Sequence, residues 1–223
     1  MPVYSAFVDN SPKYIEEAEL LVWSLVQLGE VRPSDIVLHT PRGFSGSSLP
    51  VSQSLGVRVC EIPSWAELNP ESQNRPHYNK IVQLLEGKFQ EQQDVVLLDC
   101  DVIATRRLAV RTRGVSGKPA DVAAIDLKVL QEVFLRAGVK LSFGRAELDG
   151  RPIPKTWLNT GFLAVSAEHR DAVGHCWAEW ARWLAKNVPE TQVPKGLSDE
   201  IALALALAAE AIPLRRVGPK WNF

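Results

Sequence analysis

The sequence predicts an α/β fold, an αβα sandwich with a mostly parallel central sheet. Short apolar runs typical of buried strands alternate along the chain with longer segments of helical periodicity, which is the pattern of parallel strands connected by helices. The run Val95 to Leu98 is apolar at every position and leads into two aspartates, Asp99 and Asp101. A strand of this composition is buried on both faces and belongs in the middle of such a sheet.

The first half of the chain contains four predicted strands and two predicted helices. The strands are Val3 to Val8, Asp35 to His39, Val57 to Ile62 and Val95 to Leu98. The first helix carries apolar residues at helical spacing from Ala18 to Leu28, and Gly29 is placed to end it. Thr40 to Pro50 is rich in Gly, Ser and Pro, which indicates a surface loop. The second helix, Tyr78 to Glu86, delivers the chain to the strand that carries the acidic pair.

The second half is less regular. Two segments are predicted as irregular chain: Arg111 to Pro119, which is basic, and Leu141 to Pro154. Two further strands are predicted at Val122 to Ile125 and Phe162 to Val165, and a long helix at Ala167 to Lys186. Ser198 is expected to cap a last helix from Asp199 to about Ala209.

Length and composition favour a single domain spanning residues 1–223, since 46% of the 223 residues are apolar. The net charge of −1 offers no basic surface overall and argues against nucleic acid as a partner. Three distant cysteines fit neither a disulfide framework nor a zinc site, which favours a reducing compartment. The longest apolar run, Ile201 to Ala209, is about half of the ~20 residues needed to cross a bilayer. We therefore expect a cytoplasmic protein without a transmembrane segment, with peripheral membrane contact left open.

The acidic pair is the most informative feature of the chain. Asp99 and Asp101 follow a buried strand at its carboxyl end, where open α/β sheets bind their ligands. Two carboxylates this close repel each other unless a cation compensates them. Mg²⁺ and Mn²⁺ prefer oxygen ligands, typically one or two carboxylates together with substrate phosphates. The pattern favours a metal and phosphate site, although such a pair can also simply cap a turn.

Three segments in order carry a family resemblance: Asp99-Cys100-Asp101, then Leu158-Asn159-Thr160-Gly161-Phe162-Leu163, then Ser198-Asp199-Glu200 at the start of a helix. This order resembles the GT-A-fold glycosyltransferases, which use nucleotide-diphosphate sugars as donors. The resemblance implies a transferase that moves a sugar from such a donor, UDP-linked by preference, to a hydroxyl acceptor of unknown identity. It also implies a divalent cation, Mn²⁺ or Mg²⁺, that bridges the donor diphosphate.

The resemblance assigns roles to particular positions. Asp99 and Asp101 match the metal-binding Asp-x-Asp motif, with Asp101 the direct ligand and Asp99 facing ribose or metal. The other donor-binding positions are Phe7, Val8 and Asp9 at the end of the first strand, Lys80 on a helix, and Asn159 and Gly161 near the donor sugar. Asp199 or Glu200 would take the acceptor proton in an inverting reaction or contact the donor sugar in a retaining one. None of the four histidines, His39, His77, His169 and His175, lies in the C-terminal tail to act as a third metal ligand.

Simpler interpretations exist for several of these residues. Lys80 could be a solvated helical lysine, and Asn159 to Gly161 could be a turn before a strand. Asp199 and Glu200 are acids in the first turn of a helix, where the helix dipole favours them. Trp177, Trp180 and Trp183 recur at helical spacing and indicate packing rather than sugar stacking. Cys100 is expected to point away from the metal, because alternate strand residues face opposite sides.

Two alternative functions remain. A relative could bind a nucleotide sugar or glycan without catalysis, since fold alone does not establish turnover. A haloacid-dehalogenase-like phosphatase also places Asp-x-Asp after a buried strand. That class carries its motif near the N-terminus with a Thr two residues later, whereas Ile103 occupies that position here. A sugar-nucleotide pyrophosphorylase is disfavoured because Asp9 to Pro12 is not a Gly-rich, Arg-containing loop.

Overall fold

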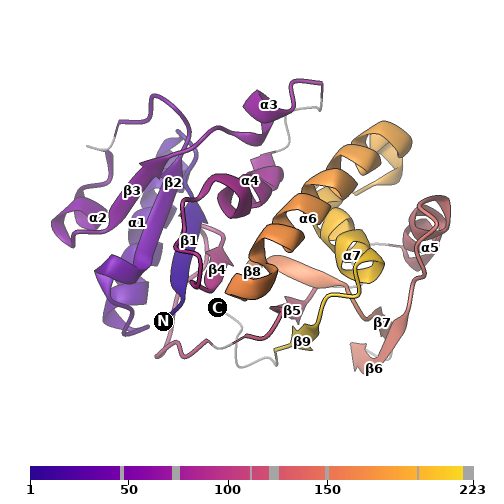
Figure 1. The fold of residues 1–223 in the computed structure, drawn as a ribbon. Helices are drawn as coiled ribbons and strands as arrows, with labels where there is room; N and C mark the ends of the chain where they lie inside the picture. The colour runs from indigo at the N-terminus through magenta and orange to yellow at the C-terminus, as the bar shows by residue number, and fades with distance from the viewer. Residues whose placement is uncertain are drawn as a thin grey trace.

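A computed structural model of the chain describes residues 1–45, 48–71, 76–110, 112–120, 126–148, 151–194 and 196–217. Within these residues a seven-stranded sheet has the order β3-β2-β1-β4-β8-β5-β9, with helices on both faces (Figure 1). Pairings β1–β2, β1–β4, β2–β3 and β5–β9 are parallel, and β8 is antiparallel to both neighbours. The predicted mixed α/β fold with a mostly parallel sheet is therefore confirmed.

The elements have the following bounds. The sheet strands are β1 (Val3–Phe7), β2 (Ile36–Thr40), β3 (Arg58–Glu61), β4 (Val95–Leu98), β5 (Val115–Pro119), β8 (Leu158–Val165) and β9 (Leu214–Arg216). A separate hairpin is formed by β6 (Phe143–Leu148) and β7 (Arg151–Pro154). The α-helices are α1 (Pro12–Gln27), α2 (Pro50–Ser54), α3 (Trp65–Leu68), α4 (Asn79–Glu86), α5 (Leu127–Arg136), α6 (Ala167–Asn187) and α7 (Ser198–Ala209). Short 3₁₀ turns lie at Pro33–Asp35, Pro76–Tyr78 and Glu190–Gln192.

Strand β4 divides the core into two layers. Val96 and Leu98 pack in one hydrophobic cluster with the buried side of α1, whereas Val95 and Leu97 pack in another with α4, α6 and α7. All four side chains are at most 2% exposed. The uniformly apolar sequence of β4 therefore reflects burial on both faces, as expected for a central strand.

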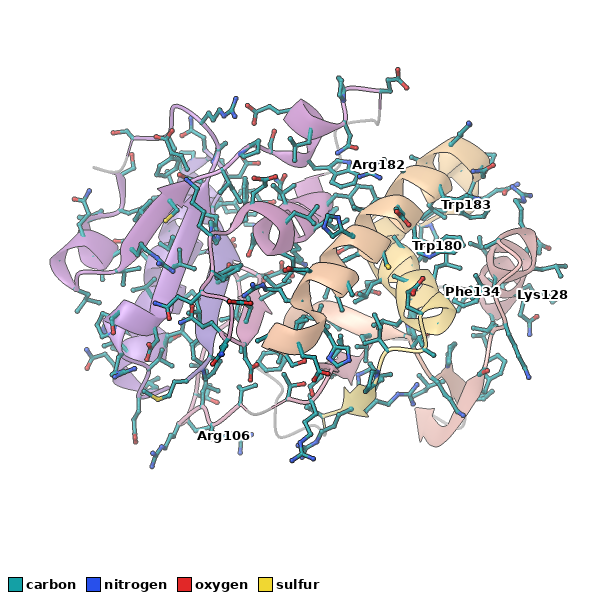
Figure 2. The ribbon with its side chains drawn as sticks, viewed as in Figure 1. Arg106, Lys128, Phe134, Trp180, Arg182 and Trp183 are labelled. Atoms are coloured by element: carbon teal, nitrogen blue, oxygen red, sulfur yellow. The ribbon has the colours of Figure 1, made fainter. Side chains whose placement is uncertain are left out.

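The tryptophans of helix α6 act in packing, as predicted: Trp177 is buried, and Trp180 and Trp183 are partly buried against a core cluster. Trp177 is fully buried under α7, and its indole N–H donates to the backbone oxygen of Asp199 at 2.9 Å. Trp180 and Trp183 contact each other edge to face with centroids 5.4 Å apart (Figure 2). These side chains act in packing, which agrees with their helical spacing.

Several local predictions are wrong. Arg111 to Pro119 contains β5, and Leu141 to Pro154 contains both strands of the β6–β7 hairpin rather than a loop. Strand β5 is rich in polar and turn-forming residues, but its hydrogen bonds to β8 and β9 hold it extended, so tertiary pairing overrides local propensity. Ser198 is the first residue of α7 rather than its cap, and Leu197 precedes it without a side-chain hydrogen bond. The strand predicted at Val122 to Ile125 lies outside the described residues.

The helices of the described ranges include none whose length and apolar character would allow it to cross a bilayer.

Candidate active site

A pocket of about 160 Å³ lies at the carboxyl ends of β1 and β4. Asp99 follows β4 directly, and Phe7 and Asp9 line the pocket from the end of β1. Tyr14 and Glu17 border it from the first turns of α1. The lining is completed by His77, Asn79, Lys80, Gln83, Leu98, Cys100 and Asp101. The pocket thus lies at the edge of the sheet where ligand binding is expected for an open α/β fold.

Lys80 connects this pocket to the interior. It lies in the first turn of α4, and its ammonium nitrogen is 2.7 Å from Asp99 Oδ1. The same ammonium donates to Thr160 Oγ1 at 3.0 Å. Thr160 Oγ1 in turn donates to Asp199 Oδ2 at 2.6 Å. A continuous chain of charge-assisted contacts therefore joins β4, α4, β8 and α7.

The charges of this network shift the pKa of two of its members. Burial by itself lowers the pKa of Lys80, but the carboxylates of Asp99, Asp199 and Glu200 outweigh burial and hold that pKa above its ordinary value. Burial, reinforced by Asp199, raises the pKa of Glu200 to about 8. At neutral pH Lys80 is therefore charged, whereas Glu200 is mostly protonated and can donate a hydrogen bond.

Asp199 and Glu200, the predicted catalytic residues, are buried rather than exposed to solvent. Their side chains begin in the first turn of α7, where the whole residues are 1% and 7% exposed, and neither lines the pocket. Asp199 Oδ1 and Glu200 Oε2 have no hydrogen-bond partner among the described residues. Buried carboxyl oxygens without a partner are costly, so these atoms are available to a ligand group that reaches them.

Asn159 and Gly161 belong to β8 itself, because the strand begins at Leu158 rather than at Phe162 as predicted. The Asn159 side chain accepts the Gly161 amide at 2.7 Å, and the Asp99 amide donates to the Gly161 oxygen at 3.1 Å. A Cβ atom at Gly161 would lie 2.8 Å from Asn159 Oδ1 and 3.0 Å from Asp99 Oδ2. Glycine lets the Asn159 and Asp99 side chains lie directly against the backbone here, and a Cβ atom would force the ends of those side chains to shift.

Of the three residues predicted to bind the donor at the end of β1, two line the pocket and one does not. Phe7 and Asp9 line the pocket, but Val8 is fully buried and its side chain packs in the core beside α1. Only the backbone of Val8 could contact a ligand. The thiol of Cys100 lies 3.1 Å from the Phe7 oxygen and donates to it, so it points toward β1. Strand alternation does not apply to this side chain, because β4 ends at Leu98 and Cys100 lies in the turn that follows, where it lines the same pocket as Asp99 and Asp101.

Several residues that form this site were not identified as site residues from the sequence: Tyr14, Glu17, His77, Asn79, Gln83 and Thr160. Gln83 belongs to a buried polar network in which Ser5 Oγ lies 2.8 Å from Gln83 Oε1 and 3.0 Å from His39 Nδ1. His39 Nε2 lies 3.3 Å from the Gly87 oxygen. This network ties the middle and the C-terminal end of α4 to β1 and β2, and so helps to fix the helix that carries Lys80. The sequence did carry a signal for Gln83, because it lies three residues after Lys80 on one helix and residues at that spacing share a helix face.

The acidic pair offers suitable ligands for a divalent cation. Asp99 Oδ1 is paired with Lys80, while Asp99 Oδ2 lies near Gly161, and Asp101 is an exposed residue that lines the pocket. Among the residues that the structure describes, no three His, Cys, Asp or Glu side chains are grouped to hold a metal. Hard carboxylate oxygens fit Mg²⁺ or Mn²⁺ when phosphate oxygens and water complete the coordination shell.

Comparison with solved structures identifies the class of fold. The chain matches structures of GT-A glycosyltransferases, and it has their mixed α/β fold. The galactosyltransferase LgtC, solved with donor and acceptor sugar analogues, aligns with a TM-score of 0.59 and 16% identity over 99% of this chain and 74% of LgtC. Mouse xyloside xylosyltransferase 1, solved without ligand, aligns at 0.58 and 11% identity over 99% of this chain and 86% of that protein.

A third structure, the bifunctional glycosyltransferase WbbM, aligns at 0.55 and 10% identity over 99% of this chain and 39% of WbbM. No protein-family model matches the sequence, and no curated protein matches it either. At these identities the comparisons establish the fold, while the chemistry has to be argued from the site.

Proposed function

We propose that this protein is a glycosyltransferase that moves a sugar from a nucleotide-diphosphate donor, UDP-linked by preference, to a hydroxyl acceptor. The observation that supports this most directly is the Lys80–Asp99 ion pair, at 2.7 Å, in the wall of a pocket formed by the ends of β1 and β4. The glycosyltransferase fold of the matched structures supports the same conclusion.

Sugar transfer leaves negative charge on the departing diphosphate. Asp99 and Asp101 would hold Mn²⁺ or Mg²⁺, and the cation would supply charge stabilisation for that leaving group. Lys80 contributes a fixed positive charge beside Asp99, already oriented by Thr160. Such preoriented charge stabilises a developing anion without reorganisation during the reaction. Phe7, Asp9 and the backbone of Val8 would contact the nucleotide, and Asn159 and Gly161 the donor sugar.

Asp199 and Glu200 complete the proposal with different roles. Asp199 accepts from Thr160 and lies 3.7 Å from Lys80, so it orients both groups. Glu200, with its pKa raised to about 8, is suited to donate a hydrogen bond to a donor-sugar oxygen rather than to remove an acceptor proton at neutral pH.

Thermal-shift titration with UDP, GDP, CDP and ADP, each with and without Mn²⁺, tests the proposal. We expect metal-dependent stabilisation by UDP that is lost in Asp101→Ala, together with slow release of sugar from the matching donor. Stabilisation without transfer or donor hydrolysis would support a non-catalytic nucleotide-sugar-binding protein, an outcome consistent with the depth of Asp199 and Glu200. Hydrolysis of a generic phosphate ester that Asp99→Asn abolishes would instead indicate a phosphatase.

A further inference from the structure

A second pocket, of about 480 Å³, lies at the edge of the sheet opposite the candidate active site. It is lined by Tyr4 on β1, by Asp35 directly before β2 and by Asp94 directly before β4. These residues mark the amino ends of the three strands, close to the N-terminus in Figure 1. Tyr4 precedes Phe7 of the first pocket by three residues, which is about 10 Å along an extended strand. The two pockets share no residue, and the second has a volume typical of small-molecule sites.

Two stretches of chain form walls of this pocket and are held in place by backbone hydrogen bonds. The first, residues 30–32, follows α1, and its Val31 amide donates to a backbone oxygen of that helix at 3.0 Å. The second, residues 107–110, is attached through the Leu108 amide, which donates to the Gly29 oxygen at 3.0 Å. Both stretches place apolar side chains in the lining: Val31, Leu108, Ala109 and Val110. The pocket therefore exists before a ligand binds, as is usual for small-molecule sites.

The charged side chains of this pocket already have partners within the protein. Arg32 donates to both carboxylate oxygens of Asp35, at 2.8 and 3.1 Å. Arg107 pairs with Glu30 at 3.4 Å, and Asp94 accepts the first amide of α6 at 2.9 Å. A ligand anion would have to compete with these carboxylates, which outnumber the two guanidiniums of the lining by three to two. A ligand cation would find each carboxylate already engaged, so the pocket suits a neutral ligand.

Tyr4 offers the pocket a hydrogen-bond donor that the fold does not use. The whole residue is 4% exposed, and its hydroxyl has no hydrogen-bond partner among the described residues. The hydroxyl oxygen is not sealed from solvent, so a ligand in the pocket can reach it. Burial, with a smaller contribution from Asp35, raises the pKa of Tyr4 to about 12, so the hydroxyl keeps its proton at neutral pH. A ligand oxygen that accepts this hydrogen bond would remove the cost of leaving a largely buried polar group unpaired.

We propose that this pocket binds a neutral carbohydrate unit. A sugar hydroxyl donates and accepts hydrogen bonds at once, so it can accept from Tyr4 and donate to a neighbouring carboxylate such as Asp35. Arg32 uses two of its five N–H donors on Asp35, and the others remain for sugar oxygens. The C–H groups of a pyranose ring would pack on the apolar walls. A purely apolar ligand fits less well, because it would desolvate the Tyr4 hydroxyl and the ion pairs without giving them new partners.

Saturation-transfer NMR tests this site with the methyl glycosides of glucose, galactose, mannose and N-acetylglucosamine, in the absence of nucleotide and metal. We expect saturation transfer to at least one glycoside, whose titration then gives the dissociation constant. Tyr4→Phe should bind it about fivefold more weakly, because one hydrogen bond is lost. The melting temperature of this variant should not fall, since the hydroxyl has no partner in the fold to lose. Ala109→Trp, at an exposed position of the lining, should block the pocket, whereas Ala109→Ser should bind as the wild type does.

Tyr14→Phe is the matched control, because it removes a tyrosine hydroxyl from the candidate active site instead. The proposal is overturned if no glycoside binds, or if Tyr4→Phe and Ala109→Trp both bind as the wild type does. It is also overturned if Tyr14→Phe weakens binding as much as Tyr4→Phe, since the sugar would then occupy the first pocket. Displacement of the glycoside by inorganic phosphate would overturn it too, because the ligand would then be an anion.

The two pockets can be tested independently of each other. Glycoside binding that depends on Tyr4, in a protein that binds no nucleotide diphosphate, would support this site and remove only the proposed function. Nucleotide binding and sugar transfer without glycoside binding at Tyr4 would leave the proposed function standing and overturn the second site.

Discussion

The Lys80 ammonium and the Asp99 carboxylate are 2.7 Å apart, yet their side chains differ in exposure, 8% for Lys80 and 41% for Asp99. The pair therefore spans the boundary between the interior and the pocket. On the inner side Lys80 also contacts Thr160 and Asp199, so a change at the pocket wall is coupled to α7 through a single side chain. This arrangement makes Lys80 the residue whose replacement should affect both stability and ligand binding.

Replacing Lys80 by Met should destabilise the protein by about 3 kcal/mol, because it leaves Asp99 and the buried Asp199 without their counter-ion. Lys80→Arg, which keeps the charge, should lose less. Urea denaturation measures both values, and UDP titration should show weaker binding in the Met variant. Lys13→Met is the control for stability, since the largely exposed Lys13 side chain pairs with Glu17 and lies over the Tyr14 ring at the surface, with an expected effect of about 0.5 kcal/mol or less. Equal losses in the two Met variants would contradict this account.

A methyl group at Gly161 should disturb the pocket directly. In Gly161→Ala the new Cβ would lie 2.8 Å from Asn159 Oδ1 and 3.0 Å from Asp99 Oδ2. It would therefore clash with Asn159 and displace the Asp99 carboxylate. We expect nucleotide affinity with Mn²⁺ to fall roughly tenfold, equivalent to about 1.4 kcal/mol, measured by calorimetric titration.

Gly117→Ala separates this effect from general overpacking. Gly117 lies in β5, and a Cβ there would meet the side chains of Leu158 and Leu163 at 3.1 and 3.3 Å rather than a carboxylate. That variant should lose stability but keep its nucleotide affinity. If both alanine variants bind nucleotide as the wild type does, Gly161 has no role in shaping the pocket.

The central part of the fold was predictable because β1, β4 and α4 carry strong local signals. Val95 to Leu98 is uniformly apolar, and its burial on both faces follows from that composition. By contrast, β5 and β9 have weak local patterns and depend on pairing with distant strands, which single-sequence periodicity does not encode.

The candidate site was predictable to the extent that motifs mark it. Asp99, Asp101 and Lys80 were found from spacing and resemblance, and the structure places all three at one pocket. The depth of Asp199 and the bridging role of Thr160 were not predictable, because they depend on how α7 packs against β8. Sequence order identified the participating segments, but tertiary packing decides which side chains reach the pocket.

His39 should make stability fall at acid pH. Burial is the main reason that its pKa is lowered to about 4, with Arg58 contributing, while its contact with Gly87 opposes the shift. The unfolded chain, with an ordinary His pKa of 6.5, then binds the proton more strongly than the folded protein between pH 6.5 and 4. Stability should therefore decrease by about 1.4 kcal/mol for each pH unit below 6.5 from this group alone.

Urea denaturation of wild type and His39→Asn at pH 7 and pH 5 isolates this contribution, because the other titrating groups are common to both proteins. The variant should be less stable at pH 7, since Ser5 and Gly87 lose a fitted partner, but its stability should decline less on acidification. His175→Asn is the control at an exposed histidine and should retain the wild-type slope. A His39→Asn slope identical to wild type would show that His39 is protonated normally in the fold.

Glu200 should produce the opposite dependence, at alkaline pH. Its pKa rises from 4.5 to about 8 because of burial and the nearby Asp199, so the folded protein binds this proton more strongly than the unfolded chain. Stability from this group is present below pH 4.5 and is lost as the pH rises toward 8, by about 1.4 kcal/mol per unit. Glu200→Gln, which is permanently neutral, should flatten that decline in urea denaturation between pH 6 and pH 8. Glu168→Gln, which changes an exposed acid in the first turn of α6, is the control and should keep the wild-type decline.

If neutral Glu200 donates to the donor sugar, wild-type transfer should fall above pH 8 while the Gln variant stays active there. A Gln variant that loses all transfer at every pH would mean that the ionised carboxylate is the working form.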